Sequence, residues 1–183
     1  DLFWTGDLDD WRALGKSVKI YKTVKAREIW KQIAQAAWKS AEPGVVFTDR
    51  YNKRSNTWYF EKIICTNPCG EQGLGAWAVC NLGSMNLVPY ATSGKFNFES
   101  FAADAKVAMR MLDNTIDANF YFYDENRRSQ MEIRRTGLGI MGLADAMILL
   151  GIRYGSEESI KFTEDVYRTL RDGAYESSVD IAS

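Results

Sequence analysis

No residue between Gln72 and Gly94 carries a charge, although Asp, Glu, Lys and Arg make up 26% of this 183-residue chain. The stretch is long enough to cross a bilayer. The four glycines, the proline and several amide and hydroxyl side chains within it argue against a membrane helix. We therefore predict that the stretch lies in the interior of a soluble protein, where neighbouring groups satisfy its polar side chains.

Cys69 stands just before this stretch, with an amide (Asn67) and a carboxylate (Glu71) two residues to either side. Side chains alternate with period two in an extended strand, so all three would project to the same side. Pro68 favours an extended Asn67, and Gly70 lets the backbone bend tightly. A core cysteine needs no such neighbours, and a carboxylate in an uncharged interior is costly without partners or a raised pKa. The combination predicts a functional site.

The two other cysteines admit plainer interpretations. Cys65, at the end of a predicted strand, is interpreted as a small buried hydrophobic residue, and the residues alone leave open whether Cys80 is structural or functional. A structural zinc site uses four thiolate or imidazole ligands, whereas the chain has three cysteines and no histidine. An iron–sulfur radical enzyme of the C-x₃-C-x₂-C kind would need a cysteine at Gln72. We therefore predict no metal site.

The composition excludes several classes of function. Without histidine the chain cannot carry Ser-His or Cys-His catalysis, and a net charge of −1 gives no footprint for nucleic acid or an acidic membrane. The acidic residues 1–10 lack the apolar core of a secretory signal. Few cysteines in an odd number suit the reducing cytoplasm. Because the chain opens on Asp1 and stops at Ser183 within a predicted helix, we interpret it as an internal segment of a larger protein.

The periodicity of apolar residues indicates an α/β chain. Helical spacing predicts helices over about 25–41 and 98–118, and a last helix after a Ser156 cap. Their predicted apolar faces include Phe101, Ala105, Ala108, Leu112 and Ile116 in the second, and Ile160, Val166, Leu170 and Ala174 in the last. Short strands are predicted at 16–22, 45–47 and 58–65. Helices interleaved with few strands indicate the α/β class, with a helical segment over about 98–183.

A glycine cluster within this helical segment, Gly137–Gly142, matches the pattern G-x-G-x-x-G. The dinucleotide fingerprint requires an apolar strand just before it, and here the preceding residues are charged. We therefore interpret residues 125–150 as helical, with the glycines allowing close helix packing, and predict no dinucleotide binding. Arg134 and Arg135 are interpreted as solvated or paired with nearby acids such as Glu132 and Asp145, rather than as phosphate ligands.

Three stretches carry a resemblance to a known family. T-N-P-C-G-E-Q at 66–72, followed by C-N-L-G-S-M-N-L at 80–87, resembles the active-site loop of the large catalytic chain of ribonucleotide reductase in its adenosylcobalamin-dependent (class II) form. A-R-E-I-W through E-P-G-V-V-F-T-D-R-Y-N at 26–52 and R-R-T-G-L-G-I-M-G-L-A-D at 134–145 agree with it. The oxygen-dependent class usually has other residues around the same Asn, Cys and Glu, so Pro68 and Gly70 favour the cobalamin form.

The resemblance implies a fold. The family's catalytic domain is a ten-stranded α/β barrel with the active-site loop threaded through its centre. Residues 1–183 would form a fragment of that barrel domain, roughly its central part, with the active-site loop at about 65–87. The uncharged stretch would then line or cross the barrel interior.

The resemblance also implies a role for each site residue. Cys69 matches the cysteine that becomes a thiyl radical and takes the 3′-hydrogen of the ribose, Glu71 the general base for the 3′-hydroxyl, and Asn67 the amide that hydrogen-bonds the sugar. Cys80 matches one member of the pair that delivers two electrons and becomes a disulfide. Its partner lies earlier in the family's chain, and no cysteine precedes Cys65 here. A second departure is glycine around 73–77, where the family often has proline.

The implied cofactor is adenosylcobalamin, and the implied partners are a ribonucleotide, a thioredoxin-type dithiol reductant and dNTP or ATP effectors bound by the parent protein. We expect the parent to be a cytoplasmic homodimer that binds neither nucleic acid nor membrane. We expect the segment alone to be inactive, because the family's phosphate-binding loop is absent from it. Two alternatives are an oxygen-dependent (class I) reductase large subunit and a non-catalytic cysteine-bearing binding domain.

Overall fold

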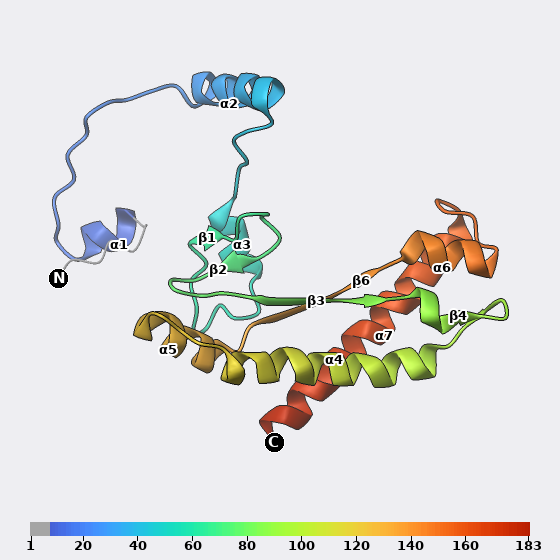
Figure 1. The fold of residues 1–183 in the computed structure, drawn as a ribbon. Helices are drawn as coiled ribbons and strands as arrows, with labels where there is room; N and C mark the ends of the chain where they lie inside the picture. The colour runs from blue at the N-terminus through green and yellow to red at the C-terminus, as the bar shows by residue number, and fades with distance from the viewer. Residues whose placement is uncertain (1–7) are drawn as a thin grey trace. The chain divides into compact units, whose positions relative to one another are not determined.

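The computed structural model describes residues 8–183 (Figure 1). Part of the acidic start of the chain, residues 1–7, lies outside the described residues. The chain divides into two compact units between Ala76 and Trp77, and each is described by itself.

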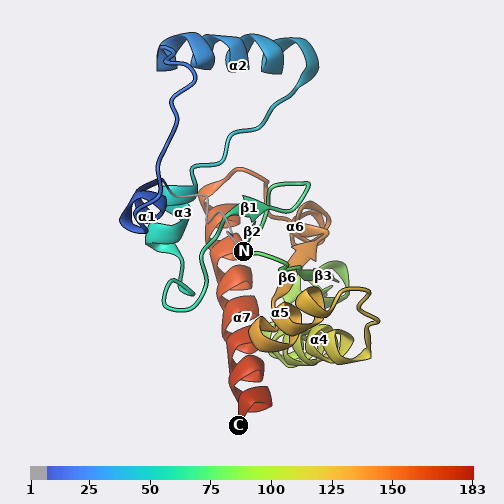
Figure 2. The same ribbon diagram turned by 90° about the vertical axis from the view of Figure 1, so that its left-hand side faces the viewer.

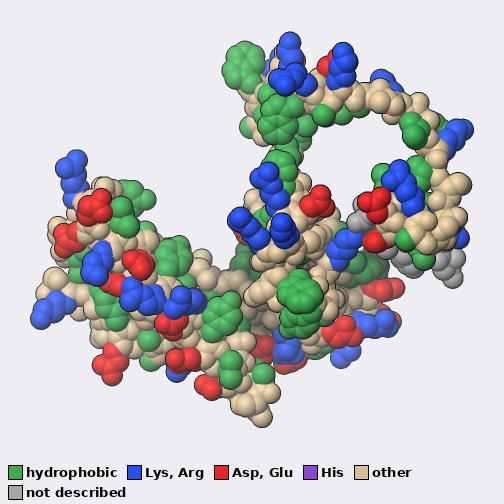
Figure 3. All heavy atoms as spheres, turned by 180° about the vertical axis from the view of Figure 1, so that it is seen from behind, with side chains coloured by type: hydrophobic (Ala, Val, Ile, Leu, Met, Phe, Trp, Pro, Cys, Tyr) green, Lys and Arg blue, Asp and Glu red, His purple; other side chains and the backbone are tan. Residues whose placement is uncertain are grey.

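Within residues 8–76, the first unit contains three helices and one small hairpin. The helices are α1 (Leu8–Ala13), α2 (Ala26–Ser40) and α3 (Thr48–Arg54). Two short strands, β1 (Cys65–Thr66) and β2 (Gly73–Leu74), pair antiparallel. The helix predicted over 25–41 is confirmed as α2, which ends where Ala41 takes a left-handed conformation with φ of 60°. Large apolar side chains are exposed on this helix (Figure 3), among them Trp30 and Trp38.

The strands predicted in the first unit are largely wrong. Residues 16–22 and 45–47 have no strand conformation and are exposed, and the predicted strand over 58–65 is a turn followed by irregular backbone that reaches β1 only at its last residue. A strand forms only where a neighbour accepts and donates its ladder hydrogen bonds. Aromatic and β-branched residues alone were therefore not enough to make these segments strands.

The second unit is built on a pair of parallel strands, β3 (Asn81–Asn86) and β6 (Thr136–Met141). Parallel strands need a long connection, and here α4 (Phe98–Ala118) and α5 (Asp124–Ile133) lie between them in the chain (Figures 1 and 2). A 3₁₀ turn at Val88–Tyr90 and the hairpin of β4 (Ala91–Thr92) with β5 (Lys95–Phe96) precede α4. The chain ends with α6 (Leu143–Leu150) and α7 (Glu157–Ala182).

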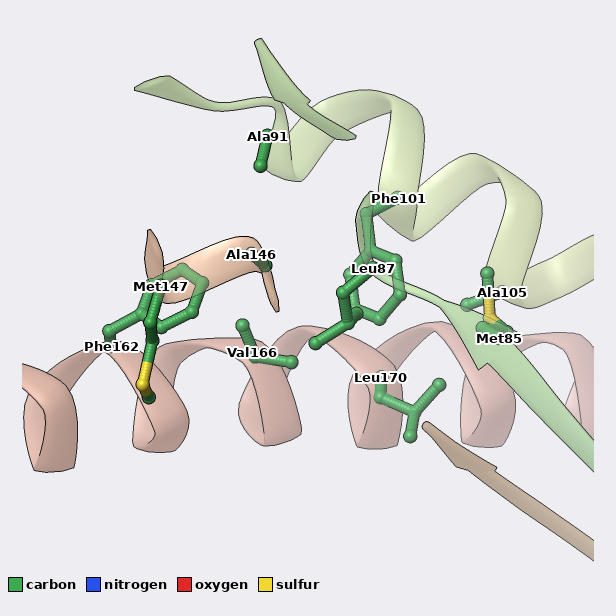
Figure 4. Packing of buried hydrophobic residues seen from close by; sticks show 10 residues of the cluster. All are labelled: Met85, Leu87, Ala91, Phe101, Ala105, Ala146, Met147, Phe162, Val166 and Leu170. Carbon is green, nitrogen blue, oxygen red and sulfur yellow. The ribbon is translucent and has the colours of Figure 1, made fainter. Parts of the chain in front are cut away.

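The hydrophobic core lies between one face of the β3–β6 pair and the helices α4, α6 and α7 (Figure 4). Strand alternation places Met85 of β3 on this face, followed by Leu87 beyond the strand end, while Leu82, Ser84 and Asn86 are exposed. The cluster contains Met85, Leu87, Ala91, Phe101, Ala105, Ala146, Met147, Phe162, Val166 and Leu170. The uncharged stretch is therefore buried at some positions and exposed at others, which corrects the expectation that it lies wholly in an interior.

The long helices of this unit begin and end as their sequences predict. Asn97 caps α4 by accepting from the backbone N–H of Ser100 at 3.0 Å, and Ser156 caps α7 by accepting from that of Ser159 at 3.2 Å. Gly151 ends α6 with φ of +72°. The predicted apolar faces are wrong at one position, because Ile160 is 59% exposed.

The prediction of helix over 125–150 is confirmed for α5 and α6 but is wrong for the glycine cluster between them, which is a strand. Every residue of β6 pairs with β3, from Asn81 opposite Thr136 to Asn86 opposite Met141. The last glycine of the cluster, Gly142, has φ of +73° and precedes α6. Inside the strand, Gly137 lies close against Leu82 of β3, whereas Gly139 has room for a Cβ atom, so the glycines do not serve helix packing.

Candidate active site

The site predicted around Cys69 lies in the loop of the β1–β2 hairpin. Cys65 pairs with Leu74 and Thr66 with Gly73. Across the loop the backbone N–H of Asn67 donates to the carbonyl of Gln72 at 3.2 Å, and the N–H of Gln72 donates to Oδ1 of Asn67 at 2.9 Å. These two bonds close the loop and fix its ends.

The chain turns sharply within this loop. The N–H of Gly70 donates to the carbonyl of Asn67 at 3.0 Å, and Gly70 has φ of +79°. The predicted bend at Gly70 is therefore confirmed. The expectation that Asn67, Cys69 and Glu71 share one side of an extended strand is wrong, because the strand stops at Thr66. All three residues lie instead in the loop that joins β1 to β2.

The three side chains differ in exposure. Asn67 is half-buried, whereas Cys69 and Glu71 are exposed in this chain. The expectation of a carboxylate inside an uncharged interior is thus not met at Glu71. The thiol of Cys69 and the carboxylate of Glu71 are therefore both open to solvent in this chain.

Two residues that sequence reasoning missed hold the base of the hairpin. Asn52 on α3 accepts from the N–H of Ile63 at 2.8 Å through Oδ1 and donates to the carbonyl of Ile63 at 2.8 Å through Nδ2. Buried Glu61 accepts from the N–H of Gly75 at 3.1 Å and from the hydroxyl of Thr57 at 3.2 Å. A single acid among the aromatic and apolar residues before Cys65 was the available signal for Glu61.

Gly75 is needed for the close approach of Glu61. A Cβ atom at position 75 would lie 2.7 Å from Oε1 of Glu61, which is inside contact distance. Glycine at position 75 therefore has a local structural reason.

Cys65 and Cys80 lie outside the loop. Cys65 is exposed, which corrects its interpretation as a buried residue, and its Sγ lies 3.7 Å from the carbonyl oxygen of Leu74. Cys80 belongs to the second unit, where it precedes β3 and is half-buried. Its Sγ lies 3.7 Å from the carbonyl oxygen of Asn81. The loop thus brings together three of the four predicted site residues, and Cys80 is placed by the other unit.

Arg134 ties the start of β6 to α4. Its guanidinium bonds Asp113 through Nε at 2.7 Å and Nη2 at 2.9 Å, and Asp117 through Nη1 at 3.0 Å and Nη2 at 2.9 Å. These hydrogen bonds raise the pKa of Arg134, and its hydrogen bonds lower the pKa of the Asp117 carboxyl. The predicted pairing of Arg134 with acids is confirmed, but its partners are Asp113 and Asp117 rather than Glu132 and Asp145.

Within residues 8–183 no group of three or more His, Cys, Asp or Glu residues is arranged to hold a metal ion. No helix in the same range is long and apolar enough to cross a membrane.

The family model and the known proteins that this chain resembles all belong to one family. A family model described as "Ribonucleotide reductase, barrel domain" matches residues 9–183. The vitamin B12-dependent ribonucleoside-diphosphate reductase of Thermoplasma acidophilum is 39% identical over 185 aligned residues, which cover 100% of this chain and 24% of that protein. The enzyme of the same name from Mycobacterium tuberculosis H37Rv is 35% identical over 90% of this chain and 23% of that protein. The ribonucleoside-diphosphate reductase large subunit of variola virus is 33% identical over 100% and 24%. The chain therefore spans about a quarter of the length of these relatives.

Proposed function

Because this chain belongs to the ribonucleotide reductase family, whose barrel domain it matches over residues 9–183, we propose that the protein containing it reduces ribonucleotides to 2′-deoxyribonucleotides. The observation that carries the proposal is the hairpin loop, which holds an amide, a thiol and a carboxylate within five residues, Asn67 to Glu71. Ribonucleoside diphosphates are the substrate named for the relatives, and we propose a ribonucleotide of this kind here.

The first step uses Cys69 and Glu71. Cys69 as a thiyl radical takes the 3′-hydrogen of the ribose and becomes a thiol, and it returns the hydrogen at the end of the turnover. Glu71 accepts the proton of the 3′-hydroxyl as general base. What supports these roles is that both residues lie in one short loop that the Asn67–Gln72 hydrogen bonds close.

Asn67 orients the sugar. Its Oδ1 already accepts from Gln72, so the amide group that remains to bind a sugar hydroxyl is the Nδ2 donor. A donor held by a closed loop is pre-oriented, which is how binding geometry contributes to rate.

Cys80 supplies electrons together with a partner thiol outside this chain. Two thiols lose two protons and two electrons and form one S–S bond, while the substrate loses its 2′-hydroxyl as water and gains hydrogen at C2′. A thioredoxin-type dithiol then reduces the disulfide by exchange. Cys80 is a half-buried thiol in the structure, which is compatible with this role.

The radical source we propose is adenosylcobalamin, which supplies an unpaired electron when bound. An exposed Cys69 thiol fits the need for access from such a source. The chain has no histidine that could bind a free cobalt ion. A cobalt ion that is already held in its own macrocycle does not need such a ligand, and the residues present fit a cofactor of that kind. We assign no residue of this chain to cofactor binding. The names of the Thermoplasma and Mycobacterium relatives support this choice.

The runner-up is an oxygen-dependent reductase, whose radical comes from a separate metal subunit. It is favoured by the similarity to the variola large subunit, whose name mentions no vitamin B12. A cobalamin absorption spectrum on adding cofactor to the full-length protein distinguishes the two sources.

The parallel β3–β6 pair with helices on one face supports a place for this chain in the proposed ten-stranded barrel. For the parent protein we propose a cytoplasmic homodimer regulated by dNTP or ATP effectors. We propose that residues 1–183 alone are inactive, because Cys80 lacks its partner thiol there.

The test follows 3′-tritiated ribonucleotide with the full-length protein and cofactor. Cys69→Ser removes the thiol that takes the hydrogen, so no tritium should be exchanged or released. Cys80→Ser leaves hydrogen abstraction intact but blocks reduction, so tritium should be released and the substrate should decompose with loss of its base. The same tritium result from both variants would contradict the division of labour. A wild type that consumes no ribonucleotide would refute the proposed function itself.

A further inference from the structure

Gly137, the second residue of β6, lies directly against the Cys80 thiol. A Cβ atom built at position 137 would stand 3.3 Å from Sγ of Cys80. Cβ atoms rarely approach another atom so closely, so either the thiol or the strand would have to move.

The strand register explains why these two residues meet. Asn81 pairs with Thr136 and Leu82 pairs with Gly137. Because side chains alternate along a strand, Cys80 and Leu82 project to the same face, and Gly137 lies diagonally across from Cys80. That face is turned away from α4, since Leu82 is 60% exposed while the neighbouring Gly83 faces Leu112 of α4. The half-buried thiol of Cys80 therefore lies on the face away from α4, beside Gly137.

We propose that Gly137 is a positioning residue for Cys80, and that the missing side chain at 137 leaves the space in which the Cys80 thiol moves between its thiol and disulfide forms. The proposal rests on the proposed function, in which Cys80 and a partner thiol give up two electrons and two protons as their S–S bond forms. A methyl group at 137 would press on Sγ and hold it away from the partner. The backbone of Gly137 is not in the left-handed region, so its need for glycine comes from space and not from conformation.

The same strand supplies a matched control. Gly139 lies two residues further along β6 on the same face, and a Cβ atom there would meet nothing closer than the hydroxyl of Ser84 at 3.8 Å. Gly137→Ala and Gly139→Ala make the same chemical change in one strand, and only the first reaches Cys80.

The first measurement is the alkylation rate of Cys80 by iodoacetamide in the reduced full-length protein, followed by mass spectrometry of the peptide that contains it. We expect Gly137→Ala to slow this rate about tenfold, the factor that corresponds to one overpacked contact. Gly139→Ala should stay within about twofold of wild type. Equal rates in the two variants would overturn the proposal.

The second measurement links the contact to the reaction. In a single turnover without external reductant, Gly137→Ala should form about tenfold less deoxyribonucleotide and disulfide, while release of 3′-tritium rises above the wild-type level, as in Cys80→Ser, because Cys69 still takes the 3′-hydrogen. A loss of product with no rise in tritium release would indicate general damage and would overturn the positioning role.

The contribution of Leu82 must be tested separately, because a Cβ atom at position 137 would also stand 2.6 Å from Cδ2 of Leu82. Leu82 is exposed and its tip can turn away, so Leu82→Ala combined with Gly137→Ala should keep the slow alkylation of Cys80. Recovery of the wild-type rate in this double variant would assign the effect to Leu82 and overturn the proposal.

If Gly137→Ala does not fold, Cys80→Ala and Leu82→Ala are each added to it, because the new Cβ would lie close to both side chains. Folding restored by Cys80→Ala supports the contact with the thiol, whereas folding restored only by Leu82→Ala, or by neither, would overturn the proposal. If the wild type is inactive on ribonucleotides, the proposed function fails, but the alkylation comparison still tests the contact. An active wild type with unchanged Cys80 alkylation in Gly137→Ala would refute the role of Gly137 alone.

Discussion

The side-chain oxygen of Asn67 accepts a hydrogen bond of 2.9 Å from the backbone N–H of Gln72, across the loop that contains Cys69 and Glu71. The amide of Asn67 therefore has two tasks that use different atoms. Its oxygen holds the loop closed, and its Nδ2 group has the protons that a sugar hydroxyl can accept.

Substitutions at Asn67 should separate these tasks. Asn67→Asp keeps an acceptor for Gln72 but loses the donor, so the protein should keep its stability while kcat falls by about 10²-fold or more, the usual cost of one pre-oriented donor. Asn67→Ala loses both the acceptor and the donor. Its free energy of unfolding, measured in urea, should therefore also be about 1 kcal/mol lower than that of wild type. Full activity in Asn67→Asp would show that the amide only closes the loop.

Glu71→Gln in the full-length protein should leave folding unchanged, because the side chain is exposed in this chain. The rate should fall by about 10²–10⁴-fold, as expected when a general base is removed. Glu71→Asp is the control, since it keeps a carboxylate and should retain more activity than Gln. A rate for Glu71→Gln within a few-fold of wild type would make Glu71 a structural carboxylate and would favour a binding domain over an enzyme.

The helices of this chain could be predicted because their signals are local. The apolar spacing of 98–118 and the serine cap at Ser156 are each contained within a few turns of sequence. Both α4 and α7 accordingly begin where predicted, and Phe101, Ala105 and Ile116 are buried as expected.

The strands could not be predicted because their signals are not local. β6 contains Gly137 and Gly139, which favour no strand by themselves, and it is a strand because β3, more than 50 residues earlier, pairs with all of it. Conversely, residues 45–47 have strand-forming side chains but no partner strand within the described residues, and they stay irregular.

Candidate residues for the site could be named from the sequence, but their arrangement could not be predicted. The residue types around Cys69 and their similarity to a known loop pointed to Asn67 and Glu71. The turn that gathers them depends on the Asn67–Gln72 hydrogen bond, and the hairpin's support depends on Glu61, a residue whose partner Gly75 lies 14 positions away. Contacts of this kind follow from the folded chain and not from any pattern in a short window.

The ion pairs of Arg134 lead to a prediction on stability. Asp113 has an 11% exposed side chain and bonds two guanidinium nitrogens, whereas the Asp117 side chain is 59% exposed. Asp113→Ala leaves a half-buried guanidinium without its main partner, which should cost about 3 kcal/mol of unfolding free energy. Asp117→Ala should cost much less, because solvent screens an exposed pair.

These two variants form a matched pair, since both remove an α4 carboxylate from the same arginine. Urea unfolding of the second unit within the full-length protein measures the difference. Equal losses from both variants would contradict the view that burial sets the contribution of each carboxylate.

Tyr90 gives a prediction on pH dependence. Its hydroxyl donates to Oδ2 of Asp104 at 2.8 Å, and its ring packs on Phe96 and Phe101 at centroid distances of 5.9 and 5.1 Å. Burial, then the hydrogen bond to Asp104 and the charge of that carboxylate, raise the pKa of Tyr90 to about 12. An unfolded tyrosine has a pKa of about 10.

The sign of the effect follows from proton binding. Between pH 10 and 12 the folded protein keeps the Tyr90 proton while the unfolded chain releases it, so stability falls as pH rises through this range. The contribution of Tyr90 is fully present below about pH 10. Tyr90→Phe has no such proton, so the advantage of wild type over Tyr90→Phe in unfolding free energy should shrink as pH is raised from 8 to 11. Urea unfolding of both proteins at each pH measures it, and other tyrosines cancel in the difference.

Asp104→Asn tests the cause of the raised pKa. The amide still accepts the Tyr90 hydroxyl but carries no charge, so the pKa of Tyr90 should move only part of the way back toward its ordinary value, because burial is the largest cause of the shift. The alkaline loss of stability due to Tyr90 should therefore become smaller in Asp104→Asn without disappearing. If it disappeared, the carboxylate rather than burial among the aromatic rings would control the ionisation of Tyr90. If the advantage of Tyr90 over Phe were the same at pH 8 and pH 11, its ionisation would not be linked to folding at all.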